Sequence, residues 1–188
     1  MFRTNLATNY LKRTIRPLYG WTQATPKSGF LDPSWARGVP IYPGHVFTKT
    51  VGNNYTLIGS ADGGSGATSQ QPAGFVANFI GGAGIDELLE SGVNALGIWV
   101  LGPDAEVELL APAFDNLYSN WAGADQGTGV DTLVYAVTSG TSQGQVCLSG
   151  ASGAGIGSIS TLPVGRLIQV ESTNSIIIGG LRPGSAGI

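Results

Sequence analysis

The side chains that most often carry catalysis are scarce in this sequence. Among 188 residues, His45 is the only histidine and Cys147 is the only cysteine. A metal site needs several His, Cys or carboxylate ligands to converge, and a Ser-His-Asp triad would have to use His45. No convincing nucleophile elbow of the Gly-x-Ser-x-Gly type accompanies it. We therefore expect no catalytic residue, no metal site and no cofactor, with His45 structural or at the surface and Cys147 a small buried apolar residue.

A row of carboxylates is the remaining candidate for chemistry. Asp104, Glu106 and Glu108 alternate along the chain, which places them on one face of a strand. Paired carboxylates could bind a cation or act as general acid and base. A row of like charges also repels itself, so it would gain from a basic partner. We expect a strand face that is solvated or turned to a partner, and the basic N-terminal part of this chain or of a neighbour is a candidate.

The composition favours many short strands. Charged residues make up 11% of the chain, and there are 30 glycines and 10 prolines. Many of these stand beside Ser, Thr, Ala or Asn, a mix that marks turns between strands. The hydrophobic fraction of 42% is typical of a globular protein, and no apolar run approaches the length of a transmembrane helix. We expect a mainly β protein and no contact with a membrane.

Charge is divided unevenly along the chain. The first 37 residues hold six of the nine basic residues and one acid, whereas the segment from Asp86 to Asp131 holds nine acids and no Lys or Arg. Such asymmetry indicates a basic segment that meets an acidic surface. That surface could be nucleic acid, another protein or the acidic body of a neighbouring copy. Nucleic acid is disfavoured, because the basic charges are dilute and the body is acidic.

Residues 1–38 are predicted to form an extended N-terminal arm, separate from a β body at residues 39–188. One or two helical turns between Asn5 and Leu18 would end at Pro17, with little regular structure after them. The arm carries more aromatic side chains than a disordered tail does, so it should lie on its own body or on a partner. Deleting it should leave a folded body. The arm residues expected to contact a partner are Arg3, Tyr10, Lys12, Arg13, Arg16, Tyr19, Trp21, Phe30, Trp35 and Arg37.

The body repeats one order of elements, at about residues 40–110 and 131–181. Each copy consists of a hairpin, a Gly-rich loop, a strand opened by a Pro-x-Gly corner, and a further strand. The corners are Pro72-Ala73-Gly74 and Pro163-Val164-Gly165. Proline suits the start of a strand, where no ladder donor is needed, and glycine permits a sharp corner. Two such units predict a small β-barrel or β-sandwich with at most one short helix, near residues 85–91.

Three stretches carry a resemblance to a known family, namely Ile41–Phe47, Tyr55–Asp62 and Pro72–Asn78. Their order of Pro-Gly, strand, polar turn, strand, Pro-x-Gly and strand resembles that of the capsid decoration (cement or head-stabilisation) proteins of tailed bacteriophages. The resemblance covers residues 40–110 and, through the repeat, 131–181. The arm is not part of the pattern.

This resemblance implies a structural virion protein that decorates and stabilises a phage capsid. It implies binding to the outer surface of the major capsid protein lattice, commonly as a homotrimer, after synthesis in the host cytoplasm. An extended terminus would clamp neighbouring capsid subunits, and no catalytic residue is implied. A specific interface of standard size buries about 1,600 Å² in total, and the arm could supply a large share with its aromatic side chains as anchors.

Two other functions stay open. One is a tail- or fibre-associated β protein that binds a host receptor or a glycan, which would need exposed aromatic side chains on the body. Trp99 and Trp121 are the candidates, although the apolar run around Trp99 is typical of a core. The other is a hydrolase with a minimal site.

Overall fold

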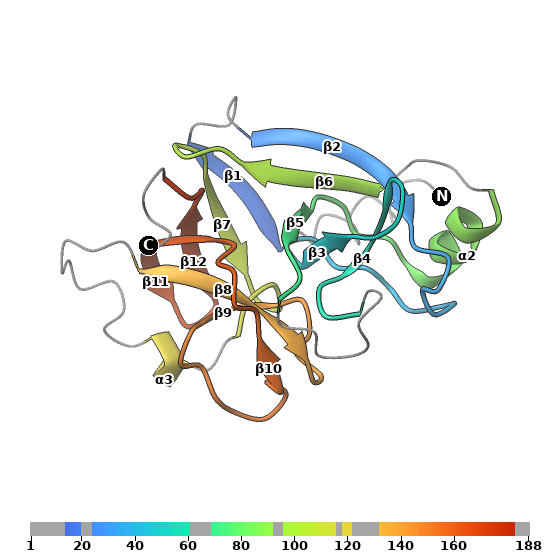
Figure 1. Cartoon of the computed structure of the whole chain (residues 1–188). Coiled ribbons are helices and arrows are strands. Elements are labelled where there is room, and N and C mark those ends of the chain that lie inside the picture. Colours follow the sequence, from blue (N-terminus) through green and yellow to red (C-terminus); the bar gives the residue numbers. More distant parts are fainter. Residues whose placement is uncertain are drawn as a thin grey trace, which may run out of the picture.

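The chain folds into a closed five-stranded barrel joined to a seven-stranded sheet (Figure 1). This computed structural model describes residues 14–19, 24–60, 69–91, 96–115, 118–121 and 132–182. Strands dominate these ranges, which confirms the mainly β class. The expectation of at most one short helix is too low, because a helix of four residues accompanies a longer one.

The barrel is built from the first part of the chain. Its strands are β2 (Ala24–Leu31), β3 (Val46–Lys49), β4 (Asn54–Leu57), β5 (Pro72–Val76) and β6 (Leu96–Leu101). They pair in the order β2-β4-β3-β5-β6, and β2 pairs again with β6. The contact of β2 with β4 is parallel and completes the closure, whereas the other pairs are antiparallel. The helix α2 (Gly82–Ser91) lies between β5 and β6 in the chain and places Ile85 in the barrel core.

The second sheet takes one strand from the arm and the rest from the later part of the chain. Its strands are β1 (Ile15–Tyr19), β7 (Glu106–Leu110), β8 (Leu133–Ser139), β9 (Val146–Leu148), β10 (Ser158–Ile159), β11 (Gly165–Ser172) and β12 (Ser175–Gly179). They follow the order β1-β7-β12-β11-β8-β10, and β9 also pairs with β8. The short helix α3 (Tyr118–Trp121) lies between β7 and β8 in the chain.

The barrel and the sheet share one connectivity. In the barrel, β3 pairs with β4 and β5, β5 pairs with β6, and β6 pairs with β2. In the sheet, β8 pairs with β9 and β11, β11 pairs with β12, and β12 pairs with β7. The parallel contact of β2 with β4 also has a counterpart, a bridge between Phe114 and Val146. The repeats therefore span residues 24–101 and 106–179 rather than 40–110 and 131–181.

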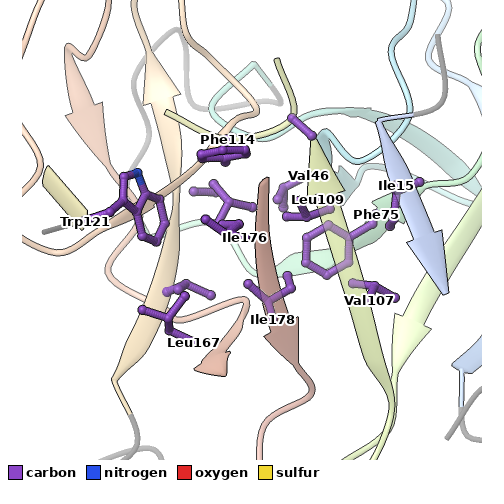
Figure 2. Close-up of a cluster of buried hydrophobic side chains, with 14 of the residues drawn as sticks. Ile15, Val46, Phe75, Val107, Leu109, Phe114, Trp121, Leu167, Ile176 and Ile178 are labelled. Atoms are coloured by element: carbon purple, nitrogen blue, oxygen red, sulfur yellow. The ribbon is translucent and has the colours of Figure 1, made fainter. Parts of the chain in front are cut away.

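Strand alternation divides the core into two clusters. Phe47 and Val76 point into the barrel, whereas their chain neighbours Val46 and Phe75 point out of it. The outward pair packs with Leu109 and other apolar side chains of the second repeat (Figure 2). One face of the barrel wall is therefore also part of the core that joins the repeats.

The described part of the arm belongs to both sheets. β1 is an outer strand of the seven-stranded sheet, and β2 closes the barrel, so the boundary at residue 38 does not separate them from the body. The predicted helical turns are wrong for residues 15–18, because β7 offers a pairing edge that local periodicity does not reveal. Residues 1–13, which would hold the rest of those turns, lie outside the described ranges. The prediction of little regular structure after Leu18 missed β2 for the same reason.

Proline blunts the outer edges of both arm strands. Leu110 donates to the carbonyl of Thr14, so alternate positions of β1, Pro17 included, turn their backbone away from β7. In β2, the N–H of Phe30 donates to the carbonyl of Asn53, so the backbone of Phe30 faces the edge that pairs with β4. Pro26 faces the same edge of β2, at a position that β4 does not reach. Proline has no N–H to offer an incoming strand at these edges. Contacts with a partner are therefore expected to use side chains rather than an added strand.

Candidate functional site

His45 lies at the contact between the two repeats. It immediately precedes β3, and its Nε2 is 3.4 Å from the carbonyl oxygen of Pro112, just beyond β7. Its ring is tilted against that of Tyr42, with ring centroids 5.8 Å apart. Within the described ranges, neither a serine hydroxyl nor a carboxylate is hydrogen-bonded to it. These contacts give His45 a structural role in joining the repeats.

Acidification is expected to weaken the fold through His45. Burial lowers the pKa of His45 from 6.5 to about 4, although the Pro112 carbonyl opposes the shift. Between these values the unfolded chain binds a proton that the folded chain does not. The free energy of unfolding should therefore fall as the pH falls, by up to about 3 kcal/mol. Urea unfolding between pH 6.5 and about 5, above the range of most carboxylates, measures this slope. An equal slope in His45→Gln would contradict the assignment.

Cys147 is fully buried in β9, as the sequence predicted. Burial, together with the nearby charge of Asp115, raises the pKa of its thiol to about 12. The reactive thiolate is therefore scarce at neutral pH. The segment Gly140-Thr141-Ser142-Gln143-Gly144 has the spacing of a nucleophile elbow, but it forms the turn between two strands, β8 and β9, instead of leading from a strand into a helix.

The acidic strand face contacts a base of the arm. Glu108 lies opposite Arg16 in the register of β7 and β1, and Arg16 Nε lies 3.2 Å from Glu108 Oε2. Ser175 Oγ donates a hydrogen bond of 2.6 Å to Glu108 Oε1. A second base of the arm, Arg37, donates to Glu90 of α2 at 2.9 Å. The arm therefore meets acidic groups of its own body, as expected for the row of carboxylates, for which the basic N-terminal part of this chain was one candidate partner.

The arm residues predicted to contact a partner differ in their exposure, and some lie outside the described side chains. Arg16 and Arg37 keep side-chain exposures of 52% and 61% beside their acidic neighbours. The Arg37–Glu90 pair is exposed on both sides and contributes at most about 1 kcal/mol, so a partner could compete for Arg37. Those outside the described side chains are Arg3, Tyr10, Lys12, Arg13, Tyr19 and Trp21.

Two aromatic residues of the arm differ in their surroundings: Trp35 packs on the barrel, whereas Phe30 is exposed. Trp35 stacks on Phe47 of the barrel, with ring centroids 5.6 Å apart, and its Nε1 donates to the Val39 carbonyl at 3.0 Å. It thus fastens the arm to its own barrel, and its role as an anchor for a partner stays a prediction. Phe30 lies on β2 with an exposed side chain and stays available.

Five large apolar side chains are exposed among the described residues. They are Leu18, Phe30, Val39, Val51 and Leu162. Two of them, Leu18 and Phe30, belong to the arm, and such side chains mark contact surfaces when they lie together. Sequence reasoning missed Val51, which is 77% exposed at the β3–β4 turn. A lone valine beside Gly52 and Asn53 was the available signal.

The two Pro-x-Gly corners line one small cavity. Its volume is about 140 Å³, and Pro72, Pro163, Phe75 and Leu181 contribute to its wall. Every lining residue is apolar or glycine. The cavity therefore offers no side chain for acid–base or nucleophilic chemistry, and the corners belong to the scaffold.

The aromatic residues proposed for a glycan site lie in the core. Trp121 is 2% exposed, packs edge-on against Phe114, and donates from Nε1 to the carbonyl of Asp115. Trp99 is half-buried and packs against the same apolar cluster. Trp121 as a glycan contact is therefore wrong, and the described residues add no support for a tail or fibre role.

Within the described ranges, no cluster of three or more His, Cys, Asp or Glu could hold a metal, and no helix is long and apolar enough to cross a membrane.

Comparison with known proteins identifies the family. No curated protein and no solved structure matches the chain significantly. A family model described as phage cement protein matches residues 1–187, so the match includes the arm that the resemblance left out. The chain therefore belongs to the phage cement protein family and is a structural component of a phage capsid.

Proposed function

We propose that this protein binds the outer surface of the major capsid protein lattice and stabilises the capsid against the pressure of the packaged genome. The family match over nearly the whole chain carries the proposal. The site supports it, because His45, Cys147 and Glu108 are engaged in contacts within the fold. Added contact area, rather than chemistry, would provide the stabilisation.

The arm is proposed to supply part of the interface, on a homotrimer. Its described strands expose Arg16, Leu18 and Phe30, a mixture of basic and apolar side chains. On a homotrimer the three arms would bind with avidity, because the second and third contacts form within one assembly. Light scattering of the purified protein tests the trimer, and a monomer or dimer would contradict it.

Co-sedimentation with capsids assembled without this protein tests the proposed function. The full chain should pellet with the capsids and raise the temperature at which they rupture. A deletion of residues 1–13 removes Arg3, Tyr10, Lys12 and Arg13 but no described strand. It should weaken binding at least about tenfold, since lost contacts of about 1.4 kcal/mol already have this effect. Full binding by the deletion variant would remove these residues from the interface.

A further inference from the structure

The barrel ends in an exposed apolar tip at the β3–β4 turn. Val51 is 77% exposed there, the largest value among the exposed apolar side chains of the described residues. Phe30 lies next to this turn, because β2 pairs Phe30 with Asn54 at the start of β4. The exposed side chains of Phe30 and Val51, from distant parts of the chain, therefore both belong to this end of the barrel.

Hydrogen bonds hold this tip in place. Asn53 Nδ2 donates to the carbonyl of Ser28 at 3.1 Å, and the Phe30 N–H donates to the carbonyl of Asn53 at 3.0 Å. Thr50 Oγ1 donates to Asp32 at 2.7 Å, which ties the other side of the turn to the arm. A preformed tip loses little entropy on binding, which favours its use as an interface.

Two exposed lysines lie at this end of the barrel. Lys49, the last residue of β3, is exposed, and Lys27 is exposed beside Ser28 on β2. No carboxylate forms a salt bridge with either lysine among the described residues. The neighbouring acid, Asp32, already accepts hydrogen bonds from Ser34 and Thr50. This end of the barrel therefore combines exposed apolar side chains with two lysines that form no salt bridge among the described residues, beside one hydrogen-bonded carboxylate.

We propose that this hairpin tip, defined as Phe30, Lys49 and Val51, docks on the capsid lattice. The surface that receives it would be an apolar depression of the major capsid protein bordered by Asp or Glu side chains. Such a surface complements the apolar side chains of Phe30 and Val51 and the charge of Lys49. The inference rests on the proposed function and adds a specific face to it.

Charge reversal at the tip tests the inference in the full chain. The double variant Lys49→Glu and Val51→Glu changes two exposed side chains, so thermal unfolding should match that of wild type. Leu162→Glu is the matched control, because it places the same acid on an exposed apolar position of the second repeat. Binding to capsids assembled without this protein is measured by co-sedimentation at two salt concentrations.

The double variant should bind at least about 30-fold more weakly than wild type, the loss expected for removal of an interface hot spot. Leu162→Glu should bind like wild type, and added salt should weaken wild-type binding more than that of the double variant. Equal binding by the double variant and wild type would overturn the docking face and leave the proposed function intact. An equal loss in Leu162→Glu would also overturn it. Failure of the wild-type protein to bind would instead overturn the proposed function and the inference with it.

Discussion

Deleting the arm, residues 1–38, is expected to unfold the protein. β2 pairs with β6 from Ala24 to Gly29 and closes the barrel against β4, so its loss would open the barrel on two sides. The deletion also removes Leu31 from the barrel core and Trp35 from its edge. Burial of one such side chain contributes about 1.5–3 kcal/mol, and the net stability of a protein is only about 5–15 kcal/mol. The cooperative thermal transition, followed by circular dichroism, should be lost.

The shorter deletion of residues 1–13 is the matched control for this result. It leaves every described strand in place, so its unfolding transition should lie close to that of the full chain. A cooperative transition of the longer deletion near the wild-type temperature would show that β2 is dispensable and that the arm is a separate part.

Gly59→Ala is expected to cost at least about 3 kcal/mol of stability, for two reasons that act together. Gly59 has a φ of +87°, a conformation that L side chains rarely adopt. A Cβ atom at this position would also lie 1.9 Å from the carbonyl oxygen of Thr138 in β8. Because backbone of the second repeat cannot move aside easily, the two repeats would have to separate. Urea denaturation measures the loss.

Gly52→Ala separates the two causes. Gly52 has a φ of +71°, but a Cβ there would meet nothing within 4 Å. Its replacement should therefore cost only about 1 kcal/mol, the strain of the backbone conformation. If the two variants lost the same stability, the close approach of the repeats at Gly59 would not matter to the fold.

Local sequence signals predicted the strands that open at a proline or fold back at a short turn. The Pro-Gly corner within Ile41–Phe47, the polar turn before Tyr55 and the strand opening at Pro72 all appear in the barrel as expected. These features depend on a few neighbouring residues, so the sequence displays them directly.

Strands and contacts that depend on distant parts of the chain could not be predicted from local sequence patterns. β1 exists because β7 accepts it, and β2 because the barrel needs a closing strand, whereas Pro17, Pro26 and Gly29 argue locally against a strand. Arg166 is a similar case, since it is only 5% exposed and donates from Nε to the Gly180 carbonyl. The guanidinium Cζ of Arg166 lies 3.2 Å from the position that a Cβ atom on Gly179 would occupy. Only the pairing of β11 with β12 brings these two positions together.

The site was predicted in part for the same reason. The charge pattern indicated a basic arm and an acidic surface, and the pairing of Arg16 with Glu108 lies within that expectation. The role of Trp35 inside its own fold and the exposure of Val51 depend on packing across the barrel. Residue type alone could not separate an anchor for the fold from an anchor for a partner.

The ratio of this protein to the major capsid protein in purified virions tests the central claim most directly. Quantitative mass spectrometry of intact particles measures it. A protein that covers the capsid lattice should be present in a simple whole-number ratio to the capsid protein, the same in every preparation. Absence from the virion, or the low ratio of a tail component, would contradict a role on the capsid surface.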